Sequence, residues 1–182
     1  YLNEALFARI KTLYEQRDNL GLNPEEMVLL QKYYKNFVRG GANLNAEEKD
    51  RLKKINEELS ILSLDFGEHV LKETNRFELV IDHADDLKGL PDNAMAAASE
   101  AAKAKGEDGT RLFNIHNPTL IHFLQTAENR DLSEKLYKAY ITMGNHNDEI
   151  DNKEIVVKMA NLRLERALML GFEHHAAYVL DK

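Results

Sequence analysis

Apolar residues recur every three or four positions over most of the chain, which is the spacing of one face of an α-helix. In the first such segment the stripe consists of Leu2, Leu6, Ile10, Leu13 and Arg17. The pattern predicts a helix with these residues on one face.

Two further helices have clear start signals. In Asn23-Pro24-Glu25-Glu26, Asn23 can cap the helix, Pro24 suits the first helical position and Glu26 can complete a capping box. Gly40-Gly41 predicts the end of this helix. Asn45 starts a third helix that runs to about Thr74, with an apolar stripe at Leu52, Ile55, Leu59, Leu62, Phe66 and Val70. We expect the three helices to form an antiparallel bundle.

The period then changes to alternation. Residues 77–81 and 111–115 alternate apolar and polar side chains and predict two short strands. An alanine-rich helix is expected between them, from about Pro91 to Lys105.

Three more helices and a partial one are expected after the second strand. The first spans residues 117–127, and the second is capped by Asp131 and Glu134. The third runs from Asp151 to about Leu170, with an Asp151–Glu154 capping box at its start and Gly171 as its C-cap. A last helix begins near Glu173. The fold class is therefore mostly α, a helical bundle-like lobe with at most two short β-strands. Residues 1–182 read as a single helical region without a clear domain boundary.

Composition narrows the function classes. The 182 residues carry a net charge of −7 and no basic cluster, which argues against nucleic-acid binding. There is no cysteine, so disulfides, Cys-ligated zinc and thiol catalysis are excluded. No apolar run approaches the roughly 20 residues of a membrane span. The chain starts at Tyr1 within a helical pattern, so we expect it to be truncated at both ends.

Glu173, His174 and His175 are residue types that bind zinc, and they are adjacent in the sequence. Adjacent side chains diverge by about 100° on a helix, whereas a local pair of ligands needs a spacing of three or four. We therefore expect no metal site here. We expect one histidine to pack against Phe172 and Tyr178 and the other to face solvent.

Other candidate sites are weaker. His69 and Glu73 have the i, i+4 spacing of a ligand pair but are expected to be a surface pair. A carboxylate-rich metal site on that helix would need a second Glu-x-x-His unit, and the sequence has none. His116 and His122 can be polar wall residues of a groove. The serines Ser60, Ser63, Ser99 and Ser133 fall in helical patterns without a nucleophile elbow.

The acidic segment NHNDEIDNKE suggests calcium at first sight. A calcium loop that starts at Asn145 needs Gly at its sixth position, but Ile150 stands there. A loop followed by a helix cap is the better interpretation.

An ordered series of motifs is more specific: NEALFARIKTLYEQRDNLGLNPEE, YYKNFVRGGANLN, INEELSILSLDFGEHVLKET, DDLKGLPDNAMAAASEAAKAKG, HNPTLIHFLQTAENRDLSEKLYKAY, DNKEIVVKMANLRLERALMLGF and EHHAAYV. It resembles the N-terminal region of the thimet oligopeptidase/neurolysin family of zinc peptidases over essentially the whole chain. The series looks most like the bacterial peptidyl-dipeptidase (dipeptidyl carboxypeptidase) branch, with oligopeptidase A as the alternative.

The resemblance implies a cytoplasmic zinc peptidase that cleaves short peptides in a deep channel. The family's catalytic helix carries H-E-x-x-H and a further Glu ligand downstream, and no H-E-x-x-H occurs in this sequence. We therefore expect no catalytic, cofactor-binding or metal-ligating residue in this chain, with zinc held by a missing C-terminal catalytic half. The chain would form a wall of the channel and be inactive alone.

A different class remains open, that of a complete, non-catalytic helical interaction module. Tyr33, Tyr34, Tyr137 and Tyr140 can supply its docking surface, although core packing is the expectation for these tyrosines. A truncated lobe would also expose apolar helix faces, which predicts self-association or weak stability.

Overall fold

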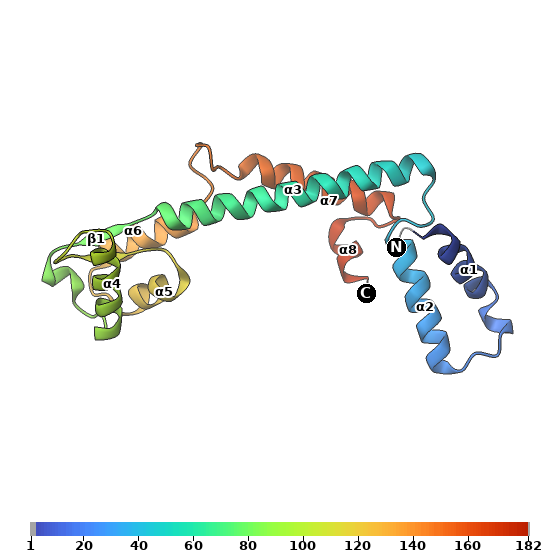
Figure 1. Cartoon of the computed structure of the whole chain (residues 1–182), viewed down its shortest axis with the longest axis horizontal. Coiled ribbons are helices and arrows are strands. Elements are labelled where there is room, and N and C mark those ends of the chain that lie inside the picture. Colours follow the sequence, from blue (N-terminus) through green and yellow to red (C-terminus); the bar gives the residue numbers. More distant parts are fainter. Residues whose placement is uncertain (1–2, 182) are drawn as a thin grey trace. The chain divides into compact units, whose positions relative to one another are not determined.

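A computed structural model describes residues 3–181 (Figure 1). The described residues form two compact units. One comprises residues up to Leu62 together with those from Val157 onward, and the other comprises Ser63–Val156. Both divisions fall inside continuous helices, α3 (Ala46–Arg76) and α7 (Lys153–Met169). No linker composition therefore marks them in the sequence. Tyr1, Leu2 and Lys182, on which the predicted truncation and part of the first stripe depended, lie outside the described residues.

The first unit begins with an antiparallel hairpin of α1 (Glu4–Glu15) and α2 (Pro24–Arg39), joined through a short 3-10 turn at Arg17–Asn19. Asn23 and Glu26 form the predicted capping box, with reciprocal hydrogen bonds of 2.9 Å. Asn45 and Glu48 do the same at the start of α3. These local start signals are confirmed because each capping box needs only residues within four positions.

Aromatic stacking holds the hairpin together. The Tyr14 and Tyr34 rings stack with centroids 3.8 Å apart, and Phe7 stacks on Phe37 at 5.6 Å. The buried face of α1 is therefore the Phe7–Tyr14 line. Leu6 and Leu13, which the sequence pattern placed on one helix face with Ile10, are exposed. The apolar sector of α1 is wider than its contact with α2, and the larger aromatic rings occupy the contact.

The same unit contains a pairing that the sequence did not indicate. Arg51 on α3 makes a bidentate ion pair with Glu165 on α7, with both N–O distances at 2.6 Å. Arg166 also donates to Asn56 at 3.1 Å. In this unit α3 therefore pairs with α7 as well as following the hairpin. Helix α8 (His175–Leu180) completes the unit.

The second unit is built on a two-stranded antiparallel sheet of β1 (Leu79–Ile81) and β2 (Arg111–Phe113), with Val80 opposite Leu112. A short 3-10 turn (Ala84–Leu87) and α4 (Asp92–Ala104) connect the strands, and α5 (Asn117–Thr126) and α6 (Arg130–Ile141) follow. Both strands and the alanine-rich helix are confirmed. Their core consists of Ile81, Leu90, Ala98, Phe113, Ile115, Leu120, Phe123, Ala127 and Leu136.

Two predicted caps differ from the structure. Asn129, and not Asp131, caps α6, because its side chain accepts from the amides of Asp131 and Leu132 at 3.1 Å. At the start of α7, Asp151 accepts from the Lys153 amide at 2.8 Å and from the Asn147 amide at 2.7 Å. Asp151 thus ties the loop to the helix rather than forming a box with Glu154.

The end of α7 is as expected. Gly171 adopts a left-handed conformation with φ +83°, and the Phe172 amide donates back to the Ala167 carbonyl at 2.9 Å. Among residues 3–181, no helix combines the length and the apolar character that crossing a membrane requires.

Candidate functional site

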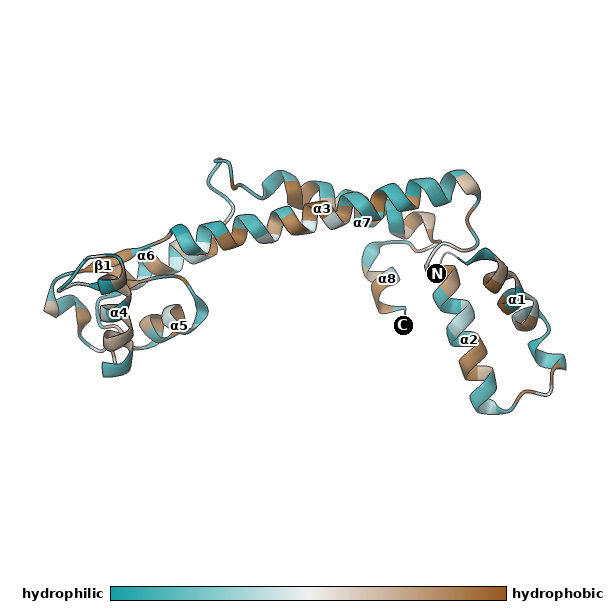
Figure 2. Ribbon diagram, viewed as in Figure 1, coloured by the Kyte–Doolittle hydropathy of each residue, from teal (hydrophilic) through white to brown (hydrophobic). Residues whose placement is uncertain are grey.

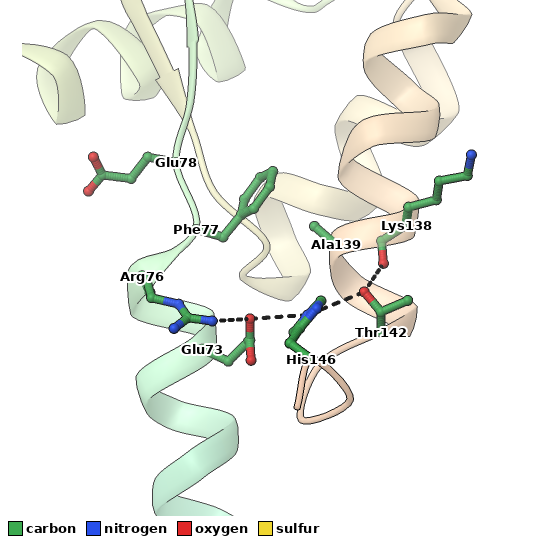
Figure 3. A pocket seen from close by; sticks show the side chains of 8 residues that line it. All are labelled: Glu73, Arg76, Phe77, Glu78, Lys138, Ala139, Thr142 and His146. Atoms are coloured by element: carbon green, nitrogen blue, oxygen red, sulfur yellow. Dashed lines mark hydrogen bonds and ion pairs between the residues drawn. The ribbon is translucent and has the colours of Figure 1, made fainter. Parts of the chain in front are cut away.

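The second unit has a pocket of about 490 Å³, within the size range of small-ligand sites. Figure 3 shows its lining side chains, which come from the end of α3, the start of the following strand segment, and α6 with the loop after it. They are Glu73, Arg76, Phe77, Glu78, Lys138, Ala139, Thr142 and His146.

Glu73 is the buried carboxylate of this pocket, with 7% of its surface exposed. Its Oε1 accepts from Arg76 at 3.1 Å and lies 3.4 Å from Nε2 of His146. Its Oε2 accepts from the Gly144 amide at 3.4 Å. A buried charge needs such partners to offset its loss of hydration. Glu73 therefore connects the end of α3 to the loop after α6.

Arg76 shares its guanidinium between two carboxylates. It donates to Asp148 at 2.9 Å as well as to Glu73. Arg76 lowers the pKa of the Asp148 carboxyl, and the hydrogen bonds to Asp148 and then Glu73 raise the pKa of Arg76. Arg76 and Asp148 therefore form an ion pair at neutral pH.

The remaining charges of the pocket are also neutralised in pairs. Lys138 is ion-paired with Glu134, and Lys105 lies 2.7 Å from Glu78. Phe77 and Ala139 are the apolar residues of the pocket lining (Figure 3). The described pocket can therefore stabilise the loop and accept an amphipathic group, but it presents no activated nucleophile beside a free base.

The predicted His69–Glu73 surface pair is not what the structure contains. Nδ1 of His69 lies 3.1 Å from Oδ1 of the buried Asn152, while Glu73 faces Arg76 and His146. No group of three or more His, Asp or Glu side chains suited to a metal ion occurs among residues 3–181.

The loop that resembled a calcium site is organised around an ammonium group. Nζ of Lys153 lies 3.0 Å from Oδ1 of Asn145, 2.6 Å from Oδ1 of Asn147 and 2.9 Å from Oδ2 of Asp151. The Lys153 side chain and backbone amides together lower the pKa of Asp151 to about 2. The oxygens that suggested calcium therefore bind this lysine, in line with the loop interpretation.

His174 and His175 have separate roles. Nδ1 of His174 accepts from the Ala177 amide at 3.0 Å, so His174 caps α8 on the surface. His175 is half-buried, with its ring 6.3 Å from that of Tyr178. Burial, followed by Arg166 and Arg163, lowers the pKa of His175. The expected division between one packed and one solvent-facing histidine is confirmed, with a capping role for His174 that the sequence analysis missed.

His116 and His122 are exposed, and neither lines the pocket. Among the tyrosines, Tyr34 is packed in the hairpin, whereas Tyr33, Tyr137 and Tyr140 are exposed. The expectation of core packing is therefore wrong for these three. Each lies on a helix face that no other element of its own unit covers sufficiently to bury it.

Arg39 is a residue that the sequence analysis did not single out. It donates to the carbonyls of Tyr178 at 2.7 Å and Asp181 at 2.6 Å, which are acceptors at the end of α8. Its guanidinium also lies 4.4 Å from the centre of the Tyr178 ring. Arg39 thus attaches α8 to α2, a long-range contact with no local sequence signal.

Comparison with curated proteins gives consistent matches. The chain is 34% identical over 178 residues to dipeptidyl carboxypeptidase of Escherichia coli, which covers 98% of this chain and 26% of that protein. It is 35% identical over 178 residues to the dipeptidyl carboxypeptidase of Salmonella typhimurium, with the same coverage. It is 31% identical over 180 residues to the organellar oligopeptidase A of Arabidopsis thaliana, covering 96% of this chain and 23% of that protein.

The resemblance inferred from the motif series is therefore confirmed. The chain spans about a quarter of the length of the curated relatives that it matches. No family model matches the chain.

Proposed function

We propose that this chain, a homologue of the dipeptidyl carboxypeptidases and oligopeptidases A, forms part of the helical wall of a peptide-cleaving enzyme. The proposal rests on the difference between two fractions: the aligned share of this chain and the aligned share of its relative. The match extends over 98% of this chain but over only 26% of the E. coli relative. Such a ratio is what a structural portion of a longer peptidase would give.

The reaction belongs to the whole enzyme. We propose that it releases dipeptides from the C-termini of short peptides, as the names of two relatives suggest. Zinc would be the cofactor, held outside these residues, since no H-E-x-x-H occurs in the sequence. In such enzymes zinc polarises the scissile carbonyl and activates water. An endopeptidase of the oligopeptidase A kind is the alternative activity. A cytoplasmic location is also proposed, because one relative is named probable cytosolic oligopeptidase A.

The residues of this chain would contribute shape and stability. The long helix α3 exposes Ile61, Leu64 and Leu71, and α7 exposes Val157, Leu164 and Leu168. Within each set the spacing is that of one helix face. We propose that these faces contact the rest of the peptidase, because a monomer rarely leaves apolar rows of this kind in water.

Elemental analysis of the purified chain is the first test. We expect zinc far below one atom per chain and no chelator-sensitive hydrolysis of short peptides. One tightly held zinc per chain would contradict the proposal. His174→Ala and His175→Ala, made separately, would then identify the ligand.

A chimera tests the wall role directly. The matched segment of the E. coli dipeptidyl carboxypeptidase is replaced by this chain, and peptidase activity is measured. We expect the chimera to retain activity that Leu64→Glu on α3 lowers at least tenfold. An exposed position outside these faces, Lys103→Glu on α4, serves as the control. A soluble, folded chimera with unchanged activity in Leu64→Glu would contradict the proposed contact.

A self-contained interaction module is the second candidate. The exposure of Tyr33, Tyr137 and Tyr140 favours it, because tyrosine is enriched at protein interfaces. The test is a chimera in which all three tyrosines are changed to Ser. Full peptidase activity would leave these tyrosines free for another partner. Loss of activity would assign them to the peptidase.

A further inference from the structure

Helix α8 is short and buries little apolar surface. It has six residues, none of which is fully buried, and Val179 and Leu180 are 40% and 81% exposed. Figure 2 shows that the hydrophobic residues of α8 lie toward its end, where these two exposed side chains are found. An isolated helix of this length is not stable in water. Helix α8 therefore depends on polar and aromatic contacts with the rest of its unit.

These contacts come from α2 and α7. Arg39 of α2 binds the carbonyls of Tyr178 and Asp181, as described above. Nζ of Lys35, also on α2, lies 2.9 Å from Oδ1 of Asp181. On α7, the guanidinium of Arg166 lies 5.4 Å from the centre of the Tyr178 ring. Lys35 and then Arg39 lower the pKa of the Asp181 carboxyl, so the ion pair at the end of α8 persists in mildly acidic solution.

The start of α8, in contrast, depends on a neutral histidine. Nδ1 of His174 accepts from the Ala177 amide at 3.0 Å and caps the helix. A protonated imidazole carries a hydrogen on both ring nitrogens and cannot accept a hydrogen bond. Protonation of His174 therefore removes the cap and leaves the Ala177 amide without this acceptor.

The surroundings of His175 also favour its neutral form. Its Nδ1 is covered from solvent and makes no hydrogen bond within residues 3–181. The neutral ring can leave this nitrogen without a hydrogen, whereas the protonated ring places there a donor that has no acceptor. Burial, followed by the charges of Arg166 and Arg163, lowers the pKa of His175. Protonation would therefore put a positive charge close to two guanidinium groups.

The other charged groups around the two histidines do not offset this repulsion. Glu173, in the turn before α8, is exposed to solvent. Asp181, at the far end of the helix, is ion-paired with Lys35 and Arg39. On the α2 side, the guanidinium of Arg39 lies 4.4 Å from the centre of the Tyr178 ring and adds a further positive charge.

We propose that His174 and His175 form a pH-sensitive switch that keeps α8 folded against α2 and α7 at neutral pH and releases it in mildly acidic solution. Protonation of His174 removes the cap, and protonation of His175 introduces an unpaired charge that its neighbours repel. Histidine is the side chain that ordinarily titrates between about pH 5 and 8, so both events fall in one range. The proposal does not rest on the proposed peptidase function.

Hydrogen exchange of the whole chain, followed by NMR, tests the switch. The Tyr178 and Asp181 amides donate to the carbonyls of His174 and Ala177 at 3.2 and 3.1 Å, so their protection reports on α8. We expect their protection factors, corrected for the intrinsic pH dependence of exchange, to fall by about tenfold between about pH 7.5 and 5.5. The amide of Ile55, a fully buried residue of α3 in the same unit, should keep its protection.

Three results of this experiment overturn the proposal. The first is equal protection of the α8 amides at both pH values. The second is no protection of these amides at about pH 7.5, because α8 would then not be held at neutral pH. The third is an equal fall at Ile55, because the whole unit, and not α8 alone, would then open.

A double variant tests the two histidines. In His174→Ser/His175→Phe, serine can cap without titrating and phenylalanine keeps an aromatic ring. The α8 amides of this variant should keep their protection at about pH 5.5. His122→Gln changes an exposed histidine on α5 and is the control, which should lose protection as the parent does. A double variant that loses as much protection as the parent overturns the proposal, and so does a control that keeps its protection.

Arg163→Gln provides a readout that does not depend on the fold of the double variant. Arg163 is exposed, so the change should leave α8 in place at neutral pH. It should raise the pH at which the His175 ring titrates, measured from the NMR signal of its Cε1 hydrogen, and reduce the loss of α8 protection in acid. A role of Arg163 in structure alone would leave the ring titration unchanged, and that result overturns the proposed part of His175.

Discussion

Nε2 of His146 lies 3.4 Å from Oε1 of Glu73. Glu73 is near the end of α3, whereas His146 is in the loop that follows α6, so this contact joins segments far apart in the sequence (Figure 3). The same carboxylate accepts from Arg76 and from the Gly144 amide. Glu73 is thus the residue on which the polar pocket depends.

Glu73→Ala should destabilise the chain by about 1–3 kcal/mol, because the Gly144 amide and Arg76 lose a buried acceptor. Urea unfolding followed by circular dichroism measures this change. Glu68→Ala is the control, because the ion pair of Glu68 with Lys72 is an exposed i, i+4 pair. Its removal should leave the free energy of unfolding nearly unchanged. Equal effects of the two variants would show that the pocket contacts contribute nothing.

Gly89→Ala should be strongly destabilising. Gly89 has φ +83°, and a Cβ atom there would overlap the carbonyl oxygen of Thr126. The left-handed conformation alone costs about 1–2 kcal/mol for an L-residue, and the backbone clash adds to it. Gly21→Ala shares a positive φ of +62° but meets no atom within 4 Å. The difference between their unfolding free energies therefore measures the clash, and a Gly89→Ala value no larger than that of Gly21→Ala would refute it.

Phe123→Ala should cost about 3–5 kcal/mol, because Phe123 is fully buried and packs edge-on against Phe113 with ring centroids 4.9 Å apart. Ile121→Ala, two positions away on the exposed side of α5, should cost about 0.5 kcal/mol or less. Chemical denaturation of both variants measures the loss of unfolding free energy. A small loss in both variants would show that the core of this unit is loosely packed.

Asp151 predicts a stability change in acid. Lys153 and backbone amides lower the pKa of Asp151 from 3.8 to about 2 in the folded chain. The unfolded chain therefore binds the proton first, so this contribution is fully present above about pH 4 and is lost as the pH falls toward 2. Asp151→Asn should be less stable than the parent at pH 7 and equal to it near pH 2. Thermal melts across this range would contradict the linkage if the difference did not shrink.

His175 predicts a second change at higher pH. Burial beside Tyr178, with Arg166 and Arg163 nearby, lowers the pKa of His175 below its usual 6.5. The unfolded state takes up the proton more readily, so stability should fall as the pH drops through about 6.5 and level off below the folded pKa. His175→Phe retains an aromatic ring without titrating and should flatten this part of the profile. An unchanged slope in the variant would assign it to other groups.

Local interactions could be read from the sequence. The Asn23 and Asn45 capping boxes, the strands around Leu79 and Leu112, and the Gly171 helix end all depend on neighbours within a few positions. Hydrogen bonds of that range and the two periodicities of side-chain direction are properties of the chain itself. The fold class and the resemblance to the peptidases followed from the same local patterns and their order.

Tertiary structure decided which faces are buried and which polar groups meet. The apolar sector of α1 includes both Leu13 and Tyr14, and only the position of Tyr34 selects the aromatic ring for the contact. Glu73 and His69 lie on the same helix but contact different residues. Glu73 accepts from the Gly144 amide, whereas His69 contacts the Asn152 side chain. Each of these contacts joins residues that are distant in the sequence. Tertiary packing brings them together, and no local preference predicts them.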